Sequence, residues 1–223
     1  MKRRTLLGAI SASMLGMAGC LGRDEYTLSA PDIEQTDDPL RIDATLSGHD
    51  VTIDGSPTLT LTLENTGETP LQLRTTNLWP FGVPVFRRAN GEYGEILLLS
   101  DRYDEAEGVN VSVGGGFRSV QLQSKPITQT LQPATPITRE YTIRGDTITT
   151  EGTYELQRNS MGRSASVTPT RRNNSSNDSR QKRMTPDDWQ YLFKYRPEDG
   201  DTYYAYQPTV SITISTKGLL PDL

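Results

Sequence analysis

Side chains that could act as nucleophiles or metal ligands are scarce in this chain of 223 residues, which contains one cysteine, Cys20, and one histidine, His49. A cysteine thiolate is the most reactive nucleophile among the side chains and can take up a covalent group. Cys20 follows a short apolar run and precedes an acidic, polar body. Because it is the only cysteine, the chain has no internal disulfide bond to form. The chemistry that we expect at Cys20 is therefore a covalent attachment.

Catalytic motifs are missing from the sequence. A paired-histidine metal site and an HExxH motif both need a second histidine. A Ser-His-Asp triad would have to use His49, because it is the only histidine. His49 lies in the turn-like stretch SGHDV, so we expect it to be a surface residue. We therefore expect no enzymatic activity and no cofactor. The paired carboxylates of a glycoside hydrolase are the alternative left open, because they are recognised only from their separation in space.

The acidic stretch DRYDEAEG offers oxygen ligands to a hard cation such as calcium. Its carboxylates belong to Asp101, Asp104, Glu105 and Glu107. Their spacing does not match an EF-hand loop, and acidic loops are common on a surface of this composition. We therefore expect no metal site here.

The first 19 residues have the features of a signal peptide. Lys2, Arg3 and Arg4 form a charged start, and residues 6–18 form a weakly apolar stretch. That stretch is shorter than the roughly 20 residues needed to span a bilayer. Small residues, Ala18 and Gly19, lie directly before Cys20, as at a cleavage site.

Two short motifs in this leader resemble those of a known class of proteins. The segment Arg3-Arg4-Thr5-Leu6-Leu7 resembles a twin-arginine export signal, and Met17-Ala18-Gly19-Cys20 resembles a lipobox. Residues 1–22, together with the acidic body, resemble the exported lipoproteins of halophilic archaea. The resemblance implies that Arg3 and Arg4 direct export and that the leader is cut before Cys20. It also implies that the Cys20 sulfur carries a lipid through a thioether and holds the protein on the extracellular face of the cell membrane.

The residues that follow Cys20 are expected to form a tether and then a folded domain. The acidic, polar residues 20–39 predict a tether that carries the lipidated cysteine. Residues 40–157 and 187–218 predict a single β-sandwich domain. Its clearest strand is TLTLTL at 58–63, in which leucines and threonines occupy opposite faces. The stretch ANGE, between expected strands at 83–88 and 93–99, is an Asn-Gly hairpin signal. Further short strands are expected at 71–73, 120–123, 137–143 and 153–157, which favours an all-β, antiparallel sandwich.

The stretches LTLENTGETPLQL, LQPATPITREYTI and EGTYEL follow one another in this order. They resemble immunoglobulin-like modules such as the proteinase-inhibitor-like domains, over residues 50–157. The resemblance implies an immunoglobulin-like β-sandwich with an adhesive, inhibitory or accessory role. Such modules usually carry Pro-Gly where this chain has Pro133-Ala134, so we expect a different turn there.

Residues 158–186 differ from the rest of the chain. They carry a formal charge of +6, whereas the remainder from Cys20 onward carries −14. Rich in Ser, Asn and Arg, they predict a long disordered basic loop, inserted before the last hairpin. It could be a solvated loop or an arm attracted to an anionic surface. Asn-x-Ser sequons, which are candidate glycosylation sites, occur at Asn110, Asn173, Asn174 and Asn177.

The stretch WQYLFKYRPEDGDTYYAY places aromatic residues at alternate positions, from Trp189 and Tyr191 to Phe193 and Tyr195. A turn at PEDG predicts that Tyr195 pairs with Thr202, Phe193 with Tyr204 and Tyr191 with Tyr206. The aromatic face is either core or a stacking platform for sugar rings. The apolar alternation of Val210, Ile212 and Ile214 continues this face and favours core. Trp189 and Tyr191, nearest the rim, are the candidate ligand platform.

These observations predict a membrane-anchored extracellular lipoprotein. Its domain would be a non-catalytic module that binds an envelope protein or a polymer, with the lipid on Cys20 as its contact with the membrane. The acidic chain, of formal net charge −5, gives no reason to expect a nucleic-acid partner. The alternative is a carboxylate-based extracellular hydrolase, or a glycan-binding module that uses the aromatic hairpin.

Overall fold

The computed structural model describes residues 25–52, 54–91, 93–114, 117–122, 126–158 and 193–217. These residues form antiparallel strands and three short 3-10 turns, so the expected all-β, antiparallel sandwich is confirmed. The strands in chain order are β1 (Tyr26–Leu28), β2 (Asp32–Glu34), β3 (Leu40–Ser47), β4 (Asp50–Val51), β5 (Thr58–Asn65), β6 (Leu71–Thr76), β7 (Pro84–Arg88), β8 (Glu95–Leu97), β9 (Val109–Gly114), β10 (Phe117–Leu122), β11 (Pro126–Leu131), β12 (Ile137–Thr142), β13 (Gly152–Arg158), β14 (Phe193–Pro197), β15 (Tyr204–Tyr206) and β16 (Thr209–Thr216). The 3-10 turns are η1 (Ala89–Gly91), η2 (Asp101–Glu105) and η3 (Gly145–Thr147).

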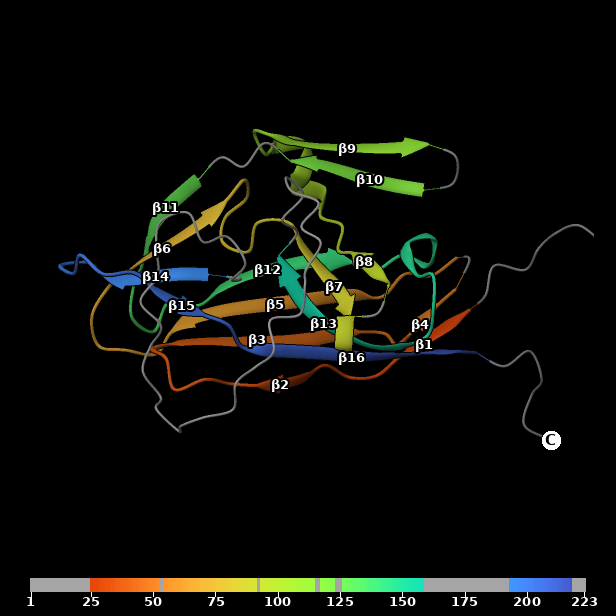
Figure 1. Cartoon of the computed structure of the whole chain (residues 1–223), viewed down its shortest axis with the longest axis horizontal. Helices are drawn as coiled ribbons and strands as arrows, with labels where there is room; N and C mark the ends of the chain where they lie inside the picture. Colours follow the sequence, from red (N-terminus) through yellow and green to blue (C-terminus); the bar gives the residue numbers. More distant parts are fainter. Residues whose placement is uncertain are drawn as a thin grey trace, which may run out of the picture.

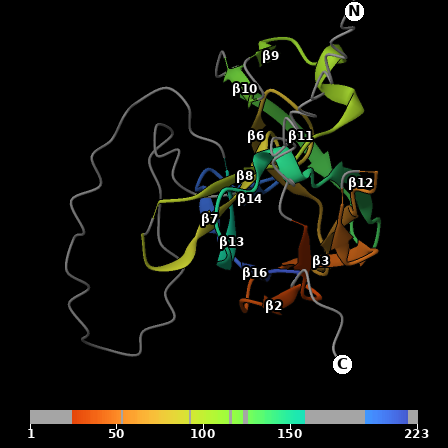
Figure 2. The same cartoon turned by 90° about the vertical axis from the view of Figure 1, so that its right-hand side faces the viewer.

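Two sheets form the sandwich (Figure 1 and Figure 2). The smaller sheet has the order β12-β5-β3, and the larger has the order β4-β1-β16-β13-β7-β8, with β2 also paired to β16. In an immunoglobulin-like sandwich, one sheet contains strands A, B and E, and the other contains C, F and G, with C′ added in variable-type domains. Here β3, β5 and β12 take the places of A, B and E. Strands β7, β8, β13 and β16 take those of C, C′, F and G.

A tyrosine corner, which is a hallmark of immunoglobulin-like folds, joins the start of strand β13 to the turn before it. Tyr154 is fully buried near the start of this strand. Its hydroxyl donates a hydrogen bond of 2.6 Å to the backbone oxygen of Thr150, four residues upstream. The bond fixes the turn between the two sheets, where an F strand must begin.

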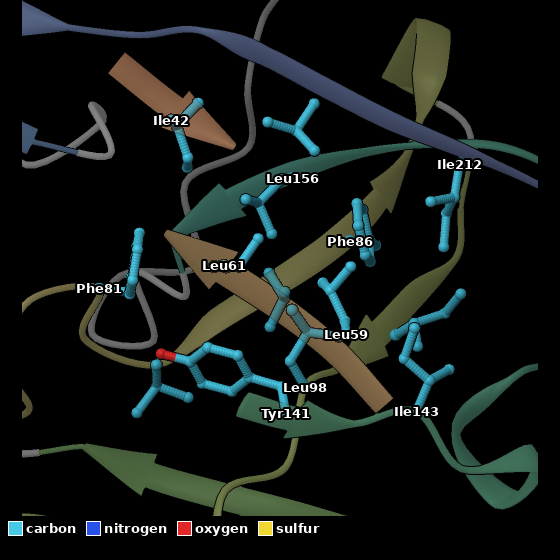
Figure 3. Close-up of a cluster of buried hydrophobic side chains, with 14 of the residues drawn as sticks. Ile42, Leu59, Leu61, Phe81, Phe86, Leu98, Tyr141, Ile143, Leu156 and Ile212 are labelled. Atoms are coloured by element: carbon cyan, nitrogen blue, oxygen red, sulfur yellow. The ribbon is translucent and has the colours of Figure 1, made fainter. Parts of the chain in front are cut away.

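The core lies between the facing sheets. The alternation in β5 buries Leu59, Leu61 and Leu63, each 0% exposed, as the sequence predicts. Figure 3 shows Leu59 and Leu61 directed toward Phe86 of β7, on the opposite sheet. Period-two alternation puts alternate side chains on one face, and burying that face stabilises the fold by roughly 1.5–3 kcal/mol for each leucine-sized side chain.

Two further groups of strands extend the sandwich. Strands β11-β6-β14-β15 form a four-stranded sheet, and β9 and β10 form a separate hairpin. The chain leaves the four-stranded sheet through Pro208 and enters the large sheet as β16. Tyr206, Pro208 and Val210 are all buried, so the even-numbered face continues across the change of sheet.

The tether expected over residues 20–39 is wrong for its second half. Tyr26–Leu28 pairs with both β16 and β4, and Asp32–Glu34 pairs with β16. Leu28 is only 1% exposed. Strands of three residues are too short to show a period in the sequence, and the acidic residues around them are typical of a linker. Tyr26–Leu28 and Asp32–Glu34 therefore belong to the folded domain and not to a tether.

Two expected turns also differ. Strands β7 and β8 pair as expected, but Arg88 N–H bonds to Gly94 O, so the loop runs through the 3-10 turn η1 instead of a two-residue Asn-Gly turn. At Pro133-Ala134 we expected a different geometry because glycine is missing. Ala134 nevertheless adopts a φ of 51°, in the left-handed region that glycine favours.

Candidate functional site

The aromatic hairpin is formed by β14 and β15 in a register shifted by two residues from the expected one. Phe193 pairs with Tyr206 and Tyr195 with Tyr204. The shift arises because Gly200 N–H bonds to Pro197 O, so the chain turns tightly at residues 197–200 and then continues through Asp201–Tyr203 before β15 begins.

The face of this hairpin that carries Phe193 belongs to the core. Phe193 and Tyr206 are each 0% exposed, and their rings stack with centroids 5.9 Å apart. Phe81 meets Phe193 edge-on at 5.5 Å and Tyr141 at 6.4 Å. Edge-to-face and offset pairs of this kind add to the stability gained from burial. The expectation that this aromatic face is core is confirmed for the described residues.

Two tyrosine hydroxyls of the hairpin hold the segment that leads into β3. Tyr195 donates a 2.6 Å hydrogen bond to Asp38 Oδ1, and Tyr206 donates one of 3.3 Å to Gln35 Oε1. Burial, and then the bond to Asp38, raise the pKa of Tyr195 far above its usual value. The Gln35 amide in turn bonds both backbone groups of Ile42, which point to the free edge of β3. The hairpin therefore fixes this edge of the small sheet.

The opposite face of the hairpin is braced by Arg196. Its guanidinium donates twice to Gln72 Oε1, at 3.0 Å from Nε and 2.6 Å from Nη2, and once to Gly200 O at 3.1 Å. The same group lies 5.1 Å from the centroid of the Tyr203 ring. Arg196 thus connects the turn to Gln72 of β6, and Tyr203 is half-buried.

The two residues predicted as a sugar platform, Trp189 and Tyr191, lie outside the described residues. Of the aromatic residues near them in sequence, Phe193 and Tyr195 are buried, and Tyr203 and Tyr204 are half-buried. A platform at Trp189 and Tyr191 stays a prediction. The buried pair cannot contribute to it.

Residues near the start of β1 define one end of the sandwich, which we call the anchor end because Cys20 precedes it. Lys217 N–H bonds to Glu25 O at 2.7 Å, and Tyr26 pairs with Thr216. The Lys217 ammonium lies 2.9 Å from Asp50 Oδ2 and, through this hydrogen bond, lowers the pKa of that carboxyl group. In Figure 1, β1 and β4 lie at one end of the molecule, and the turn between β14 and β15 lies at the other. Cys20, Arg3 and Arg4 themselves lie outside the described residues.

The acidic stretch does not gather into a metal site. Residues 101–105 form the 3-10 turn η2, in which Tyr103 is buried while Asp101, Asp104 and Glu105 are exposed. Among the described residues, no three His, Cys, Asp or Glu side chains come together in a way that could hold a metal ion. The tight turn explains this, because it spreads neighbouring carboxylates around its axis instead of pointing them at one centre.

The remaining predicted residues are placed as follows. His49 is exposed, and its Nδ1 lies 2.8 Å from the backbone oxygen of Leu28, beside the β3–β4 corner. Asn110 is exposed on β9, so its side chain is accessible, and its glycosylation stays a prediction. Asn173, Asn174 and Asn177, like the whole basic loop beyond Arg158, lie outside the described residues. In the part of the chain that the structure describes, no helix has the length and apolar character to span a bilayer.

Comparisons with known proteins add one finding. A family model described as "Domain of unknown function (DUF8130)" matches residues 1–185. No curated protein and no solved structure is significantly similar to the chain. The matched residues include Cys20 and strands β1 to β13, and they end before β14. Since the match covers most of its length, the chain belongs to the DUF8130 family, whose domain has no assigned function.

Proposed function

We propose that this protein is a lipid-anchored module on the extracellular face of the cell membrane, and that it binds another envelope component without catalysing a reaction. The observation that carries the proposal is the lone thiol of Cys20, which lies behind a signal-like leader and six positions before the first residue of the sandwich. A covalent anchor at that point leaves the far end and the flanks of the β-sandwich available for binding.

The placement of β1 supports a close and oriented attachment. Six residues of extended chain span at most about 20 Å, so Tyr26 would lie within that distance of a lipidated Cys20. The anchor end would then face the bilayer. The turn between β14 and β15, at the other end of the molecule in Figure 1, would face away from it. A partner would meet that far end or a flank of the sandwich.

The hydrogen bonds of the histidine and of two buried tyrosines support a binding role over a catalytic one. His49 is bonded to a backbone oxygen, and the buried Tyr195 and Tyr206 hydroxyls hold the segment before β3. Immunoglobulin-like sandwiches are rigid scaffolds that host unrelated binding functions. The anchored sandwich is the function that these arrangements support best.

The anchor is tested by expressing the full chain in its native kind of host and measuring its partition into detergent. Wild type should enter the detergent phase, and Cys20→Ser should remain uncut or be released, because a serine hydroxyl does not form the thioether. Lys2→Arg, which keeps the charge of the leader, is the matched control and should behave like wild type. If Cys20→Ser is cut and partitions like wild type, the anchor proposal is wrong.

The export route is tested separately. Replacing Arg3 and Arg4 together by Lys preserves the charge of the leader and removes the twin-arginine pair. Folded precursor should then accumulate inside the cell. Normal secretion of this double variant would contradict the twin-arginine route and leave the lipid anchor unaffected.

A further inference from the structure

The free edge of β3 is occupied by the side chain of Gln35. The amide donates from Nε2 to the backbone oxygen of Ile42 at 2.5 Å, and its Oε1 accepts from the Ile42 N–H at 3.4 Å. In an antiparallel strand the N–H and C=O of one residue point to the same side, and successive residues point to opposite sides. The Gln35 amide therefore occupies both backbone groups that Ile42 would offer to a further strand.

The Gln35 side chain is held in position for this contact. The Tyr206 hydroxyl donates to its Oε1 at 3.3 Å from the aromatic hairpin. On one side of Gln35, Asp32–Glu34 pairs with β16, and on the other side Asp38 accepts the hydroxyl of Tyr195 at 2.6 Å. Gln35 itself is exposed, so the contact does not follow from packing in the core. Fixing a long exposed side chain costs conformational entropy, and these neighbours offset that cost.

The opposite edge of the small sheet, along β12, is closed in a different way. Leu99 and Thr142 exchange backbone hydrogen bonds of 3.1 and 2.7 Å there. Four positions earlier, and on the same side of the strand, Thr138 O accepts from Arg139 Nη1 at 2.7 Å. Open edge strands invite pairing with other chains, and native proteins commonly block them. At β3, which pairs with β5 alone among the described strands, the block is a side chain.

The residues on either side of Ile42 suit pairing with a second copy of β3. Ile42 is 0% exposed and faces the core, so Arg41 and Asp43 lie on the outer face of the small sheet. Their side chains are 55% and 43% exposed and pair with each other at 3.1 Å. Two β3 strands paired antiparallel about Ile42 would place Arg41 of each copy directly opposite Asp43 of the other. Opposite charges at such positions favour a strand pair, and two-fold symmetry forms both contacts at once.

We propose that Gln35 is an edge guard, which is a residue whose amide keeps β3 of a second copy from pairing with β3 at Ile42. The amide satisfies the two backbone groups as a neighbouring strand would, and so removes the driving force for pairing there. The contact is autoinhibitory, because a surface that could join two copies is occupied by the chain itself. The proposal does not depend on the lipid anchor.

A purely structural role of Gln35 has to be separated from this proposal. The same hydrogen bonds join the segment before β3 to the small sheet. If that were their only effect, Gln35→Ala would be less stable and would remain a monomer. If Gln35 is a guard, its loss makes the protein associate, and the association depends on the charges at positions 41 and 43.

The test measures the mass of the full chain by sedimentation equilibrium over a wide range of protein concentration, at low ionic strength. Wild type should remain monomeric. Gln35→Ala should form a reversible dimer, with an association constant about tenfold or more above that of wild type. Since Gln35 is exposed, its replacement should leave the core intact, and urea unfolding checks this.

Hydrogen exchange gives a second measurement that does not require association. At concentrations where Gln35→Ala is monomeric, the Ile42 N–H should exchange several-fold faster than in wild type. The Asp43 N–H points toward β5, where Asp43 pairs with Thr62, and should be unaffected. Unchanged exchange at Ile42 would mean that Gln35 does not close the edge.

Two further variants test the register of the pair. Adding Asp43→Arg to Gln35→Ala places arginines opposite Arg41 and should return the protein to a monomer. Adding Arg41→Asp as well restores opposite charges in the reverse order and should restore the dimer. The matched control is Gln72→Ala, which removes a side-chain amide from the inner strand β6, where it bonds Arg196. This control should remain a monomer.

Three results would overturn the proposal. The first is a Gln35→Ala protein that associates no more than wild type. The second is a dimer that Asp43→Arg leaves unchanged, or that the reversed charges do not restore, because the strands would then not pair about Ile42. The third is a Gln72→Ala control that associates as strongly as Gln35→Ala, because the loss of any side-chain amide would then explain the dimer.

Discussion

The backbone N–H of Ala134 donates a 2.9 Å hydrogen bond to the carbonyl oxygen of Asn65, and Ala134 does so with a φ of 51°. The side chain of Asn65 is fully buried and bonds the backbone oxygens of Thr69 and Leu131. The left-handed conformation costs an L residue roughly 1–2 kcal/mol, whereas glycine adopts it freely. We therefore expect Ala134→Gly to raise the free energy of unfolding by about 0.5–1 kcal/mol, measured by urea denaturation.

The control for this substitution is Ala89→Gly. Ala89 opens the turn η1 and is not among the residues with positive φ, so glycine only adds freedom to the unfolded chain there. It should lower stability by about 0.5–1 kcal/mol. If Ala134→Gly and Ala89→Gly changed the free energy of unfolding equally, the backbone of Ala134 would not be strained.

Phe193→Ala should lower the free energy of unfolding by about 3–5 kcal/mol, because it leaves a cavity between Phe81 and Tyr206. Tyr203→Ala is the matched aromatic control, since Tyr203 is half-buried and contacts the Arg196 guanidinium. It should cost at most about 1 kcal/mol. A Phe193→Ala protein as stable as wild type would contradict the core assignment of the hairpin and favour the sugar platform.

Removal of a single phenolic oxygen should have different effects on stability at two buried tyrosines. Tyr154→Phe deletes the bond to Thr150 O that closes the corner before β13 and should cost about 0.5–1.5 kcal/mol. Tyr141→Phe deletes a hydroxyl with no partner among the described residues and should be close to neutral. Thermal unfolding of the two variants compares them directly. A large loss of stability in Tyr141→Phe would mean that its hydroxyl has an internal partner.

Alkaline pH should destabilise the protein through its buried tyrosines. Burial raises the pKa of Tyr103, Tyr141, Tyr195 and Tyr206 above the ordinary value of about 10. The neutral phenols are favoured in the folded state, so their contribution is fully present below pH ~10 and is lost as the pH rises toward the folded-state values.

Each such tyrosine should add a slope of about 1.4 kcal/mol per pH unit to the loss of stability above pH ~10. Urea unfolding at several alkaline pH values measures this slope. Tyr195→Phe should reduce it by about one tyrosine's share. A free energy of unfolding that stays constant up to pH ~11 would contradict this account.

The match to the DUF8130 family ends at residue 185, but the fold does not. Strand β16 hydrogen-bonds with β1, β2 and β13 and lies within the large sheet. A chain that ends at residue 185 should therefore show no cooperative unfolding transition by circular dichroism. A chain that ends at Lys217 keeps every described strand and should unfold like the full protein. Cooperative unfolding of the shorter chain would mean that β16 is dispensable.

The strands that the sequence predicted well are those with a buried face and several alternating residues. In β5, three leucines alternate with threonines, and all three leucines are buried. The short strands β1 and β2 were missed because three residues, such as Asp32–Glu34, show no period. Their position is set by hydrogen bonds to β16, nearly two hundred residues away in sequence, and local composition carries no information about such contacts.

The sequence predicts contacts between side chains of different elements less well than it predicts the strands. In ITREY, Arg139 occupies the same alternating face as Ile137 and Tyr141, so a charge on an otherwise apolar face was visible there. The bridge between Leu99 and Thr142 brings the segment before η2 beside the end of β12, and nothing in the local sequence predicts this contact. The same limit applies to the hairpin, where the tight turn at residues 197–200 moved the register by two.

The position of β16 also sets the order of events during synthesis. Strand β1 leaves the ribosome well before its partner Thr216, which lies 190 positions later in the chain. Until then the apolar faces of β13 and β1 lack the strand that joins them, and the growing chain exposes surface that attracts other unfolded chains. The large sheet therefore cannot close until Thr216 has been made. A transport system that accepts only folded cargo would have to wait for the last strand before it could move this protein.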